Sequence, residues 1–389
     1  MFQTCAKLTD IILPKNITAI GSHAFSGCKS LKELEIPASV KSIGAYAFQD
    51  CWALTQLAIP SGIATLENGT FYNCYYITDL NIPSSVTSIG AYAFCGCHNL
   101  SRLDIPKGVT TIGESAFNDC RELSELDIPE GVVSIGKAAF MGCGKLTGIT
   151  IPSGITEIEK NTFNGCSGLN VLQLPDGITK IGENAFSNCT GLTSLELPQD
   201  LTAIGMYAFK GCTGLAYIAI PSGVTEIDRN VFQDCTSLKH VSVPSGITYI
   251  YMYAFSGCSS LDRFSIPESV KDIYFGAFDG CSGLKSLYAS SKEPFSISSG
   301  YNPFNDVDKS ACTLYVPAGA GDTYRNAAGW SDFENIVEYD VTGIGTAAAQ
   351  STAGEIRRYA AYGQRLSSPA KGLNIVKYSD GATRKVIVR

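Results

Sequence analysis

Two cysteines and a histidine fall within four residues of this sequence, Cys95-Gly96-Cys97-His98. Thiolate sulfur and imidazole nitrogen are the ligand atoms of zinc and copper sites. The stretch therefore raises the hypothesis of a metal or redox centre. The arrangement of cysteines in the rest of the chain tests that hypothesis.

The cysteines belong to a repeat. Thirteen of the fifteen are spaced 23 residues apart, from Cys5 to Cys281, without an insertion. Phenylalanines keep the same step from Phe2 to Phe278, and prolines keep it along most of the chain. Such fixed spacing indicates a repeat architecture.

Cys97 is a member of this series, whereas Cys95 and His98 occupy positions that hold polar or large residues in other repeats. We expect Cys97 to point inward within a ladder of buried, unbridged thiols, because buried free cysteine behaves as a small hydrophobic residue. Cys95 and His98 are expected at the surface. Since Cys95 and Cys97 would then face different ways, we expect neither a metal site nor a cofactor.

One unit, residues 21–43, shows how each repeat is built. Four core positions are three residues apart: Phe25, Cys28, Leu31 and Leu34. This spacing predicts tight 3₁₀-like turns that lead into a strand. The strand alternates apolar with acidic residues and ends at Pro37, which has no N–H for a ladder hydrogen bond. Gly44 is expected to allow the turn into the next unit.

A unit of this size cannot bury its apolar residues alone, but stacked copies share one continuous core. The sequence therefore predicts a leucine-rich-repeat solenoid, mostly β with short 3₁₀ or helical turns, over residues 1–290 in about 13 turns. The strands are expected to form one continuous sheet. Residues 291–341 are expected to close the array, 342–354 to form a linker, and 355–389 to form a small all-β tail.

The pattern LxxLxIPxxVxxIGxxAFxxC resembles the BspA-like type of leucine-rich repeat, found mainly in bacterial cell-surface proteins. The resemblance implies a surface-exposed or secreted binding protein that adheres to host or matrix proteins. Residues 312–338 resemble the segment that closes such arrays, in which Trp330 and Phe333 would cover the last turn.

The C-terminal 35 residues resemble sorting domains that certain anaerobic bacteria use for secretion to the outer surface. The resemblance rests on Tyr362-Gly363-Gln364-Arg365, on Lys371-Gly372-Leu373 and on the basic end, with Asp380-Gly381 as a predicted hairpin turn. The alternative is a small β appendage without a sorting role.

Composition excludes several classes of function. The 389 residues carry a net charge of -7 with an isoelectric point near 5.1, which argues against a nucleic-acid partner. The sequence contains no run of 18 apolar residues, so no transmembrane segment is predicted. The first residues read like a repeat cut in half and contain no signal peptide. The three histidines lie in separate repeats and no catalytic motif is present, so we expect the protein not to be an enzyme. We also expect it to be a monomer.

Two sets of outward positions are candidate binding surfaces. An acidic strand face is expected in the N-terminal half, formed by Asp10, Glu33, Glu35, Asp79, Asp104, Glu125 and Asp127. A partner-binding surface is expected in the C-terminal half, formed by Tyr217, His240, Tyr249, Tyr251, Tyr253, Arg263, Tyr274 and Phe275. A second tyrosine group surrounds Tyr75.

These residues leave three interpretations open. Exposed tyrosines are typical of protein-binding hot spots and also of sugar-stacking platforms. The chain is thus expected to bind a host or matrix protein, or a glycan, or to be a structural spacer whose charged face is merely solvated. Salt-sensitive binding would favour the acidic face, and salt-insensitive binding to sugars would favour stacking.

Overall fold

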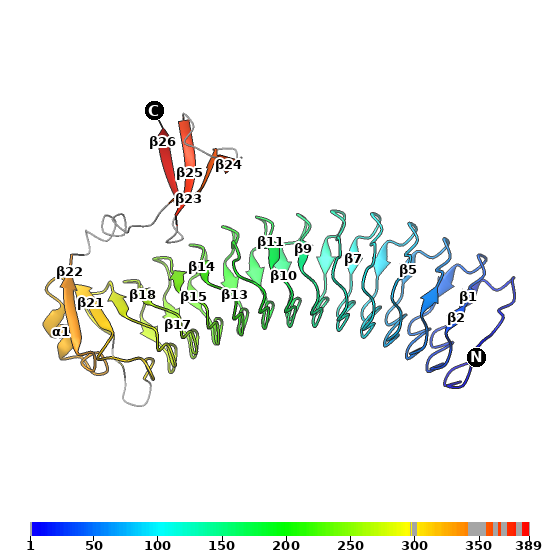
Figure 1. The fold of residues 1–389 in the computed structure, drawn as a ribbon, viewed down its shortest axis with the longest axis horizontal. Coiled ribbons are helices and arrows are strands. Elements are labelled where there is room, and N and C mark those ends of the chain that lie inside the picture. Colours follow the sequence, from blue (N-terminus) through cyan, green and yellow to red (C-terminus); the bar gives the residue numbers. More distant parts are fainter. Residues whose placement is uncertain are drawn as a thin grey trace.

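The computed structural model describes residues 2–295, 297, 302–340, 355–360, 365–366, 372–378 and 383–388. Successive 23-residue turns stack side by side into one elongated array, and the predicted solenoid is confirmed (Figure 1). The apolar side chains of all turns form a single core that runs along the array. Copies of one unit thus bury together what none could bury alone.

Most of the described turns contain two short strands rather than the single strand that was predicted, and in the others the first strand is absent or reduced to an isolated bridge. We call the strand that precedes the proline the first strand ladder: β2 (Glu33–Leu34), β4 (Gln56–Leu57), β9 (Gly148–Thr150), β11 (Val171–Gln173), β14 (Tyr217–Ala219), β16 (His240–Ser242), β18 (Arg263–Ile266) and β20 (Ser286–Ala289). Partners are parallel and 23 residues apart, as in Glu33 with Gln56.

The second strand ladder follows the proline in each turn. Its members are β1 (Ala19–Ile20), β3 (Ser42–Ile43), β5 (Thr65–Leu66), β6 (Ser88–Ile89), β7 (Thr111–Ile112), β8 (Ser134–Ile135), β10 (Glu157–Ile158), β12 (Lys180–Ile181), β13 (Ala203–Ile204), β15 (Glu226–Ile227), β17 (Tyr249–Ile250) and β19 (Asp272–Ile273). In each of these strands the isoleucine or leucine is buried and the residue before it faces outward.

The expectation of one continuous sheet was wrong. The first strand ladder is divided into separate sheets, and isolated bridges such as Arg102 with Glu125 connect turns where no regular strand forms. The second strand ladder is divided as well. A proline follows most of the first strands and cannot donate to the ladder, which keeps these strands short.

Phenylalanine and cysteine form the regular part of the core. The rings of Phe140 and Phe163 stack with centroids 5.5 Å apart and planes 11° from parallel, and this arrangement recurs from Phe2 to Phe304. Beside it, Cys143 Sγ donates a hydrogen bond to the Phe117 carbonyl of the preceding turn, 3.2 Å away. Twelve cysteines make this contact, from Cys28 to Cys281.

The three-residue spacing gives hydrogen-bonded turns that do not join into a helix. Cys28 N donates to Phe25 O and Leu31 N to Cys28 O, as in 3₁₀ geometry. However, two residues in each turn have positive φ, for instance His23 (57°) and Gly27 (77°). A left-handed residue inside each short run prevents a continuous right-handed helix.

Gly44 does not serve the turn in the way that was expected, because its φ is not positive. A Cβ at this position would lie 2.5 Å from Ser22 N in the preceding turn. The glycine therefore permits close approach between neighbouring turns rather than an unusual backbone conformation.

The C-terminal end of the array contains β21 (Thr313–Pro317), α1 (Gly321–Arg325) and β22 (Asn335–Tyr339). β21 pairs with β20 and β22 pairs with β21, all parallel. Trp330 is fully buried against Phe304, with ring centroids 5.6 Å apart, and its indole N–H donates to Phe295 O over 2.9 Å. The aromatic side chains thus continue the core past the last regular turn.

At the N-terminal end, the core positions are exposed. Phe2 is 37% exposed, and Cys5, expected to be the first rung of the buried ladder, is also exposed. No turn of this sequence precedes them, so only one side of each residue is covered. The buried ladder consequently begins at Cys28.

The C-terminal tail is all-β, as predicted. β23 (Glu355–Ala360), β24 (Arg365–Leu366), β25 (Gly372–Tyr378) and β26 (Thr383–Val388) form an antiparallel sheet in the order β24-β23-β25-β26. The predicted linker and the hairpin turn at Asp380-Gly381 lie outside the described residues.

The phenylalanine stack predicts very different costs for the same truncation at two positions. Phe140→Ala removes a ring that is packed on both faces, so the turns around it should lose about 3–5 kcal/mol of stability. Phe2→Ala removes a ring with one free face and should cost under about 1 kcal/mol. Urea unfolding of both variants measures the difference, and equal midpoints would contradict a shared, continuous core.

Buried thiols predict a simple titration. Burial raises the pKa of Cys51, Cys166 and Cys281 to about 12, so these groups stay protonated and unreactive at neutral pH. In the native protein, Ellman's reagent should reach only Cys5 and, slowly, Cys95. After denaturation without reductant all fifteen cysteines should react, whereas a smaller number would mean that some are disulfide-bonded.

Candidate interaction surface

The structure separates the two cysteines of the opening motif. Cys97 is completely buried and its Sγ donates to Phe71 O, 3.2 Å away, whereas Cys95 is partly exposed. Burial raises the pKa of Cys95 to about 11, which disfavours the thiolate that metal binding needs. Across the part of the chain that the structure describes, no three His, Cys, Asp or Glu side chains are close enough to hold a metal ion.

His98 belongs instead to a stack of outward side chains from successive turns. Its ring lies 4.7 Å from that of Tyr75, which lies 5.7 Å from the ring of Trp52, and both pairs are nearly parallel. Lys29 Nζ lies 3.9 Å from the centroid of the Trp52 ring, within cation–π distance. We call this set the N-terminal aromatic stack. Sequence analysis placed His98 at the surface but did not predict that these rings stack.

Desolvation lowers the pKa of His98, and the positive charge of Arg121 in the next turn lowers it further. Asp119 acts in the opposite direction. The neutral imidazole is therefore the form that the stack favours.

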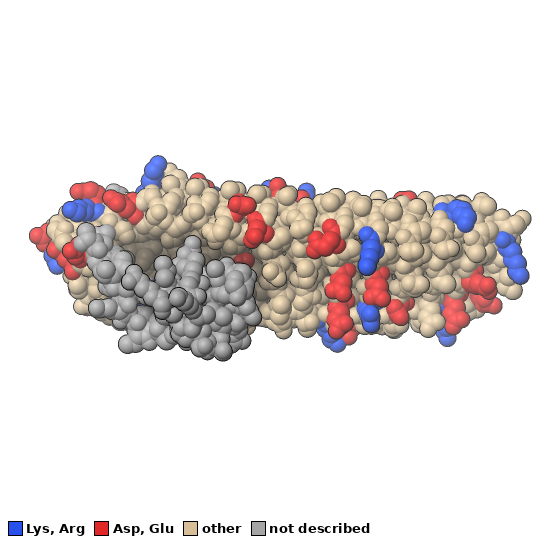
Figure 2. Space-filling view, turned by 90° about the horizontal axis from the view of Figure 1, so that it is seen from above, with Lys and Arg blue, Asp and Glu red and all other residues tan. Residues whose placement is uncertain are grey.

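The acidic strand face is exposed along its whole predicted length: Asp10, Glu33, Glu35, Asp79, Asp104, Glu125 and Asp127. Figure 2 shows acidic side chains gathered over the N-terminal half of one long face, with basic side chains between them. Arg102 Nη2, for example, lies 3.4 Å from Asp104 Oδ1, and both side chains are largely exposed. Exposed pairs of this kind add little stability and leave the face available to a partner.

The tyrosines of the C-terminal half form a compact group on the second strand ladder. Tyr251 and Tyr274 stack with centroids 5.0 Å apart, and the Tyr249 ring lies 6.0 Å from Tyr251 and 6.4 Å from Tyr274 at inclined angles. All three are partly exposed. We call them the tyrosine triad.

Tyr253 and Phe275 lie next to the triad and contact each other edge to face, with centroids 5.5 Å apart. Tyr253 has a φ of 57°, and the same left-handed position is also tyrosine at Tyr46, Tyr92 and Tyr207. A left-handed tyrosine is therefore a property of the repeat and does not by itself mark this surface.

Carboxylates accompany the triad, which sequence analysis missed. In the second strand ladder Tyr249 pairs with Glu226 on one side and with Asp272 on the other. Burial and the nearby Glu226 carboxylate, which accepts a hydrogen bond from Tyr251, raise the pKa of that tyrosine. Glu226, Tyr249 and Asp272 are 23 residues apart in the sequence. Only the pairing of the second strands shows that they are neighbours on the surface.

Tyr217, His240 and Arg263 lie on the first strand ladder, so the structure places them in a different ladder from the triad. Tyr217 pairs with His240 across β14 and β16. His240 Nδ1 lies 3.1 Å from Asp262 Oδ1, and Arg263 Nε lies 3.4 Å from the same nitrogen. The predicted C-terminal surface is thus two adjacent groups rather than one.

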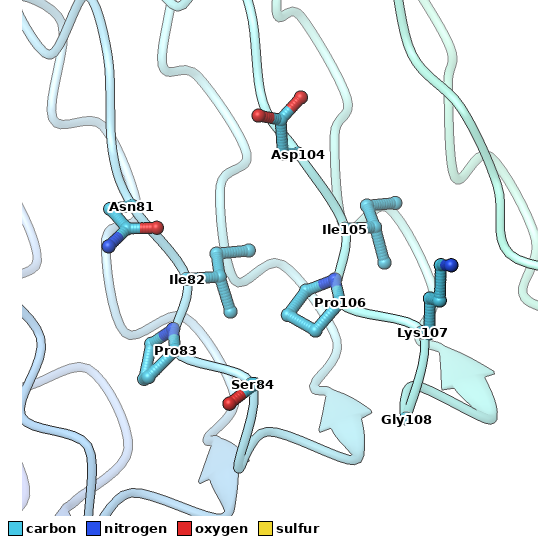
Figure 3. Close-up of a pocket in the computed structure, with 9 residues that line it drawn as sticks. All are labelled: Asn81, Ile82, Pro83, Ser84, Asp104, Ile105, Pro106, Lys107 and Gly108. Atoms are coloured by element: carbon cyan, nitrogen blue, oxygen red, sulfur yellow. The ribbon is translucent and has the colours of Figure 1, made fainter.

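A hollow of about 480 Å³ opens between two turns at the end of the first strands. It is lined by Asn81 and Asp104 on one side and by Ser84 and Lys107 on the other, with Pro83 and Pro106 between them (Figure 3). The side chains diverge and no group is enclosed. The hollow is an open depression between two turns of the array.

Comparison with known proteins agrees with this architecture. The model of the BspA-type leucine-rich repeat region matches residues 1–121, 87–215 and 179–301. The chain belongs to the BspA-type leucine-rich repeat family. No match was found among curated proteins.

Several solved structures are similar to this BspA-type chain. A leucine-rich repeat protein from Bacteroides ovatus is 27% identical with a TM-score of 0.66, covering 83% of this chain and 88% of that one. A T. pallidum leucine-rich repeat protein is 28% identical with a TM-score of 0.35, covering 47% and 78%. A leucine rich cell surface protein from Faecalibacterium prausnitzii is 23% identical with a TM-score of 0.37, covering 87% of each chain.

The N-terminal aromatic stack predicts the titration of His98. Because its pKa is lowered in the folded chain, His98 stabilises the fold above its unfolded pKa, and this contribution is lost as pH falls through the folded pKa. NMR of the three imidazoles, assigned with His98→Asn, should show His98 titrating below the ordinary value. Arg121→Gln should raise that pKa, and a His98 titration at the ordinary value would contradict the stack.

Proposed function

We propose that this BspA-type chain is a bacterial cell-surface or secreted protein that binds other proteins without catalysis. The observation that carries the proposal is the tyrosine triad, a group of partly exposed aromatic rings held in fixed positions by the array. Tyrosine provides large contact area with little loss of side-chain entropy and is enriched at protein-binding hot spots. Adhesion to a host or matrix protein is the role that this surface fits.

The alternative of a glycan-binding module has less support. A sugar ring stacks on the face of an aromatic ring, whereas Tyr251 and Tyr274 each present one face to the other. The rings of Trp52, Tyr75 and His98 likewise cover one another. The outer faces, edges and hydroxyl groups that remain form a divided surface, which suits the separate side chains of a protein better than the flat ring of a sugar.

Location at the cell surface is part of the proposal. No helix in the described ranges is long and apolar enough to cross a membrane. The resemblance of residues 355–389 to a sorting domain supports delivery to the outside, with 1–290 as the binding array, 291–341 as its closing segment and 342–354 as the linker.

A binding screen tests the proposed function. The purified chain is presented to immobilised host matrix proteins and to a glycan array, beside a Tyr249→Ala, Tyr251→Ala, Tyr253→Ala, Tyr274→Ala variant. We expect a protein hit that the variant loses. The matched control neutralises the acidic strand face with Glu33→Gln, Glu35→Gln, Asp104→Asn and Asp127→Asn.

Each outcome of the screen identifies a different surface or function. A hit that persists in the tyrosine variant but is lost in the control variant would move the site to the acidic strand face. Hits to sugars alone would favour the glycan-binding alternative. No binding to any of the matrix proteins or glycans would favour a structural spacer and contradict the proposal.

A further inference from the structure

The tyrosine triad and its carboxylates form a small grid on three consecutive turns. One column of outward residues contains Glu226, Tyr249 and Asp272. The next column, two residues further along each turn, contains Asp228, Tyr251 and Tyr274. The buried isoleucines of β15, β17 and β19 lie between the columns and hold them in register. Three aromatic rings and three carboxylates therefore share one patch.

The second column differs from the same column in most earlier turns. Seven of the nine earlier turns have glycine in this column, including Gly44, where a Cβ would lie 2.5 Å from the backbone of the preceding turn. Tyr251 and Tyr274 retain the backbone hydrogen bond that Gly44 makes, with their N–H groups donating to Ile227 O and Ile250 O. Three consecutive side chains where the fold prefers glycine point to a function at the surface.

The carboxylates of the grid are not engaged with cations. Some acidic side chains elsewhere in the array are paired with lysines of adjacent turns, as Glu183 is with Lys160 at 2.8 Å and Glu157 with Lys180 at 3.8 Å. Among the described residues no ion pair joins a lysine or arginine to Glu226, Asp228 or Asp272, although two basic residues flank the grid. The position that would supply a lysine after Glu226 holds Tyr249 instead.

We propose that this grid binds lysine or arginine side chains of a basic segment in a protein partner. A cation over a tyrosine face is attracted by the ring quadrupole, and the carboxylates beside the rings, which have no ion-pair partner, add Coulomb attraction and hydrogen-bond acceptors. Tyr249, inclined by 35° and 52° to the two stacked rings, gives the patch faces of different orientation. The inference rests on the proposed function and specifies the chemistry that the partner presents.

Arg229 and Lys271 are the basic residues that flank the grid, and both are exposed. The Arg229 backbone N–H donates to Asp228 Oδ1 over 2.7 Å, which orients that carboxylate without neutralising it. These two charges would disfavour a partner with a broad positive surface. A short basic segment that places one or two cations on the grid avoids them.

A labelled 12-residue peptide of alternating lysine and serine tests the inference with the full chain. The control peptide replaces every lysine with glutamine. In fluorescence anisotropy the lysine peptide should bind at least about tenfold more tightly than the glutamine peptide, and added salt should weaken the binding. Equal affinity for the two peptides would overturn the inference, while a protein hit in the matrix screen would leave the proposed function intact.

Variants separate the rings from the charges. Tyr249→Leu, Tyr251→Leu, Tyr274→Leu removes the rings, and Glu226→Gln, Asp228→Asn, Asp272→Asn removes the charges; each set should weaken the lysine peptide about tenfold. Tyrosine-to-phenylalanine changes at the same three positions should retain binding, since the ring faces remain. Unchanged binding in either weakening set, or a loss with phenylalanine, would contradict the inference.

The acidic strand face provides the matched control, because it carries more charge than the grid but no triad. Its Glu33→Gln, Glu35→Gln, Asp104→Asn, Asp127→Asn variant should change lysine-peptide affinity less than twofold. A larger loss would place the cation site at the other end of the array. A sugar hit that depends on the triad, with no preference for the lysine peptide, would show the grid to be a glycan site and would also overturn the inference.

Discussion

Contact between identical side chains of neighbouring turns holds this molecule together. Each phenylalanine ring stacks on the ring of the next turn, and each cysteine thiol donates to the phenylalanine carbonyl of the turn before it, as Cys143 does to Phe117. Cysteine suits this position because its sulfur is apolar enough to be buried and its S–H satisfies a carbonyl that would otherwise lack a second partner. Because the contacts run from turn to turn, the repeat length cannot change within the regular array.

The same constraint explains where the sequence varies. The phenylalanine and cysteine columns keep one residue type along the regular array, and the second left-handed position of each turn, from Gly27 to Gly280, holds glycine, asparagine or aspartate. The outward columns vary most in chemistry, because a change there in one turn affects only its neighbours. Distinct chemistry on this surface, such as the tyrosine triad, therefore marks selection on the outside of the array rather than on its stability.

Periodicity predicted the parallel stack, the buried cysteines and the exposure of the acidic strand face, because each depends only on which residues repeat at a fixed step. It did not predict the strand at Ser42–Ile43, since two residues are too few to show alternation. It also joined Tyr217 and His240 to the tyrosine triad, although the proline turn places them on separate strand ladders. Ring stacking at His98 and the carboxylates around Tyr249 depend on contacts between turns, which no single repeat shows.

The scale of the grid limits what it recognises. Neighbouring turns are about 4.8 Å apart and an extended peptide advances about 3.3 Å per residue, so three turns span about three residues of a partner. The distance between turns differs from the rise per residue of an extended peptide. Successive side chains of a peptide that runs along the array therefore do not all meet the same position of successive turns. One such patch supplies a few contacts and modest affinity. A partner that engages several patches along a rigid array adds them without a new ordering cost at each, because the turns already fix the distances between sites.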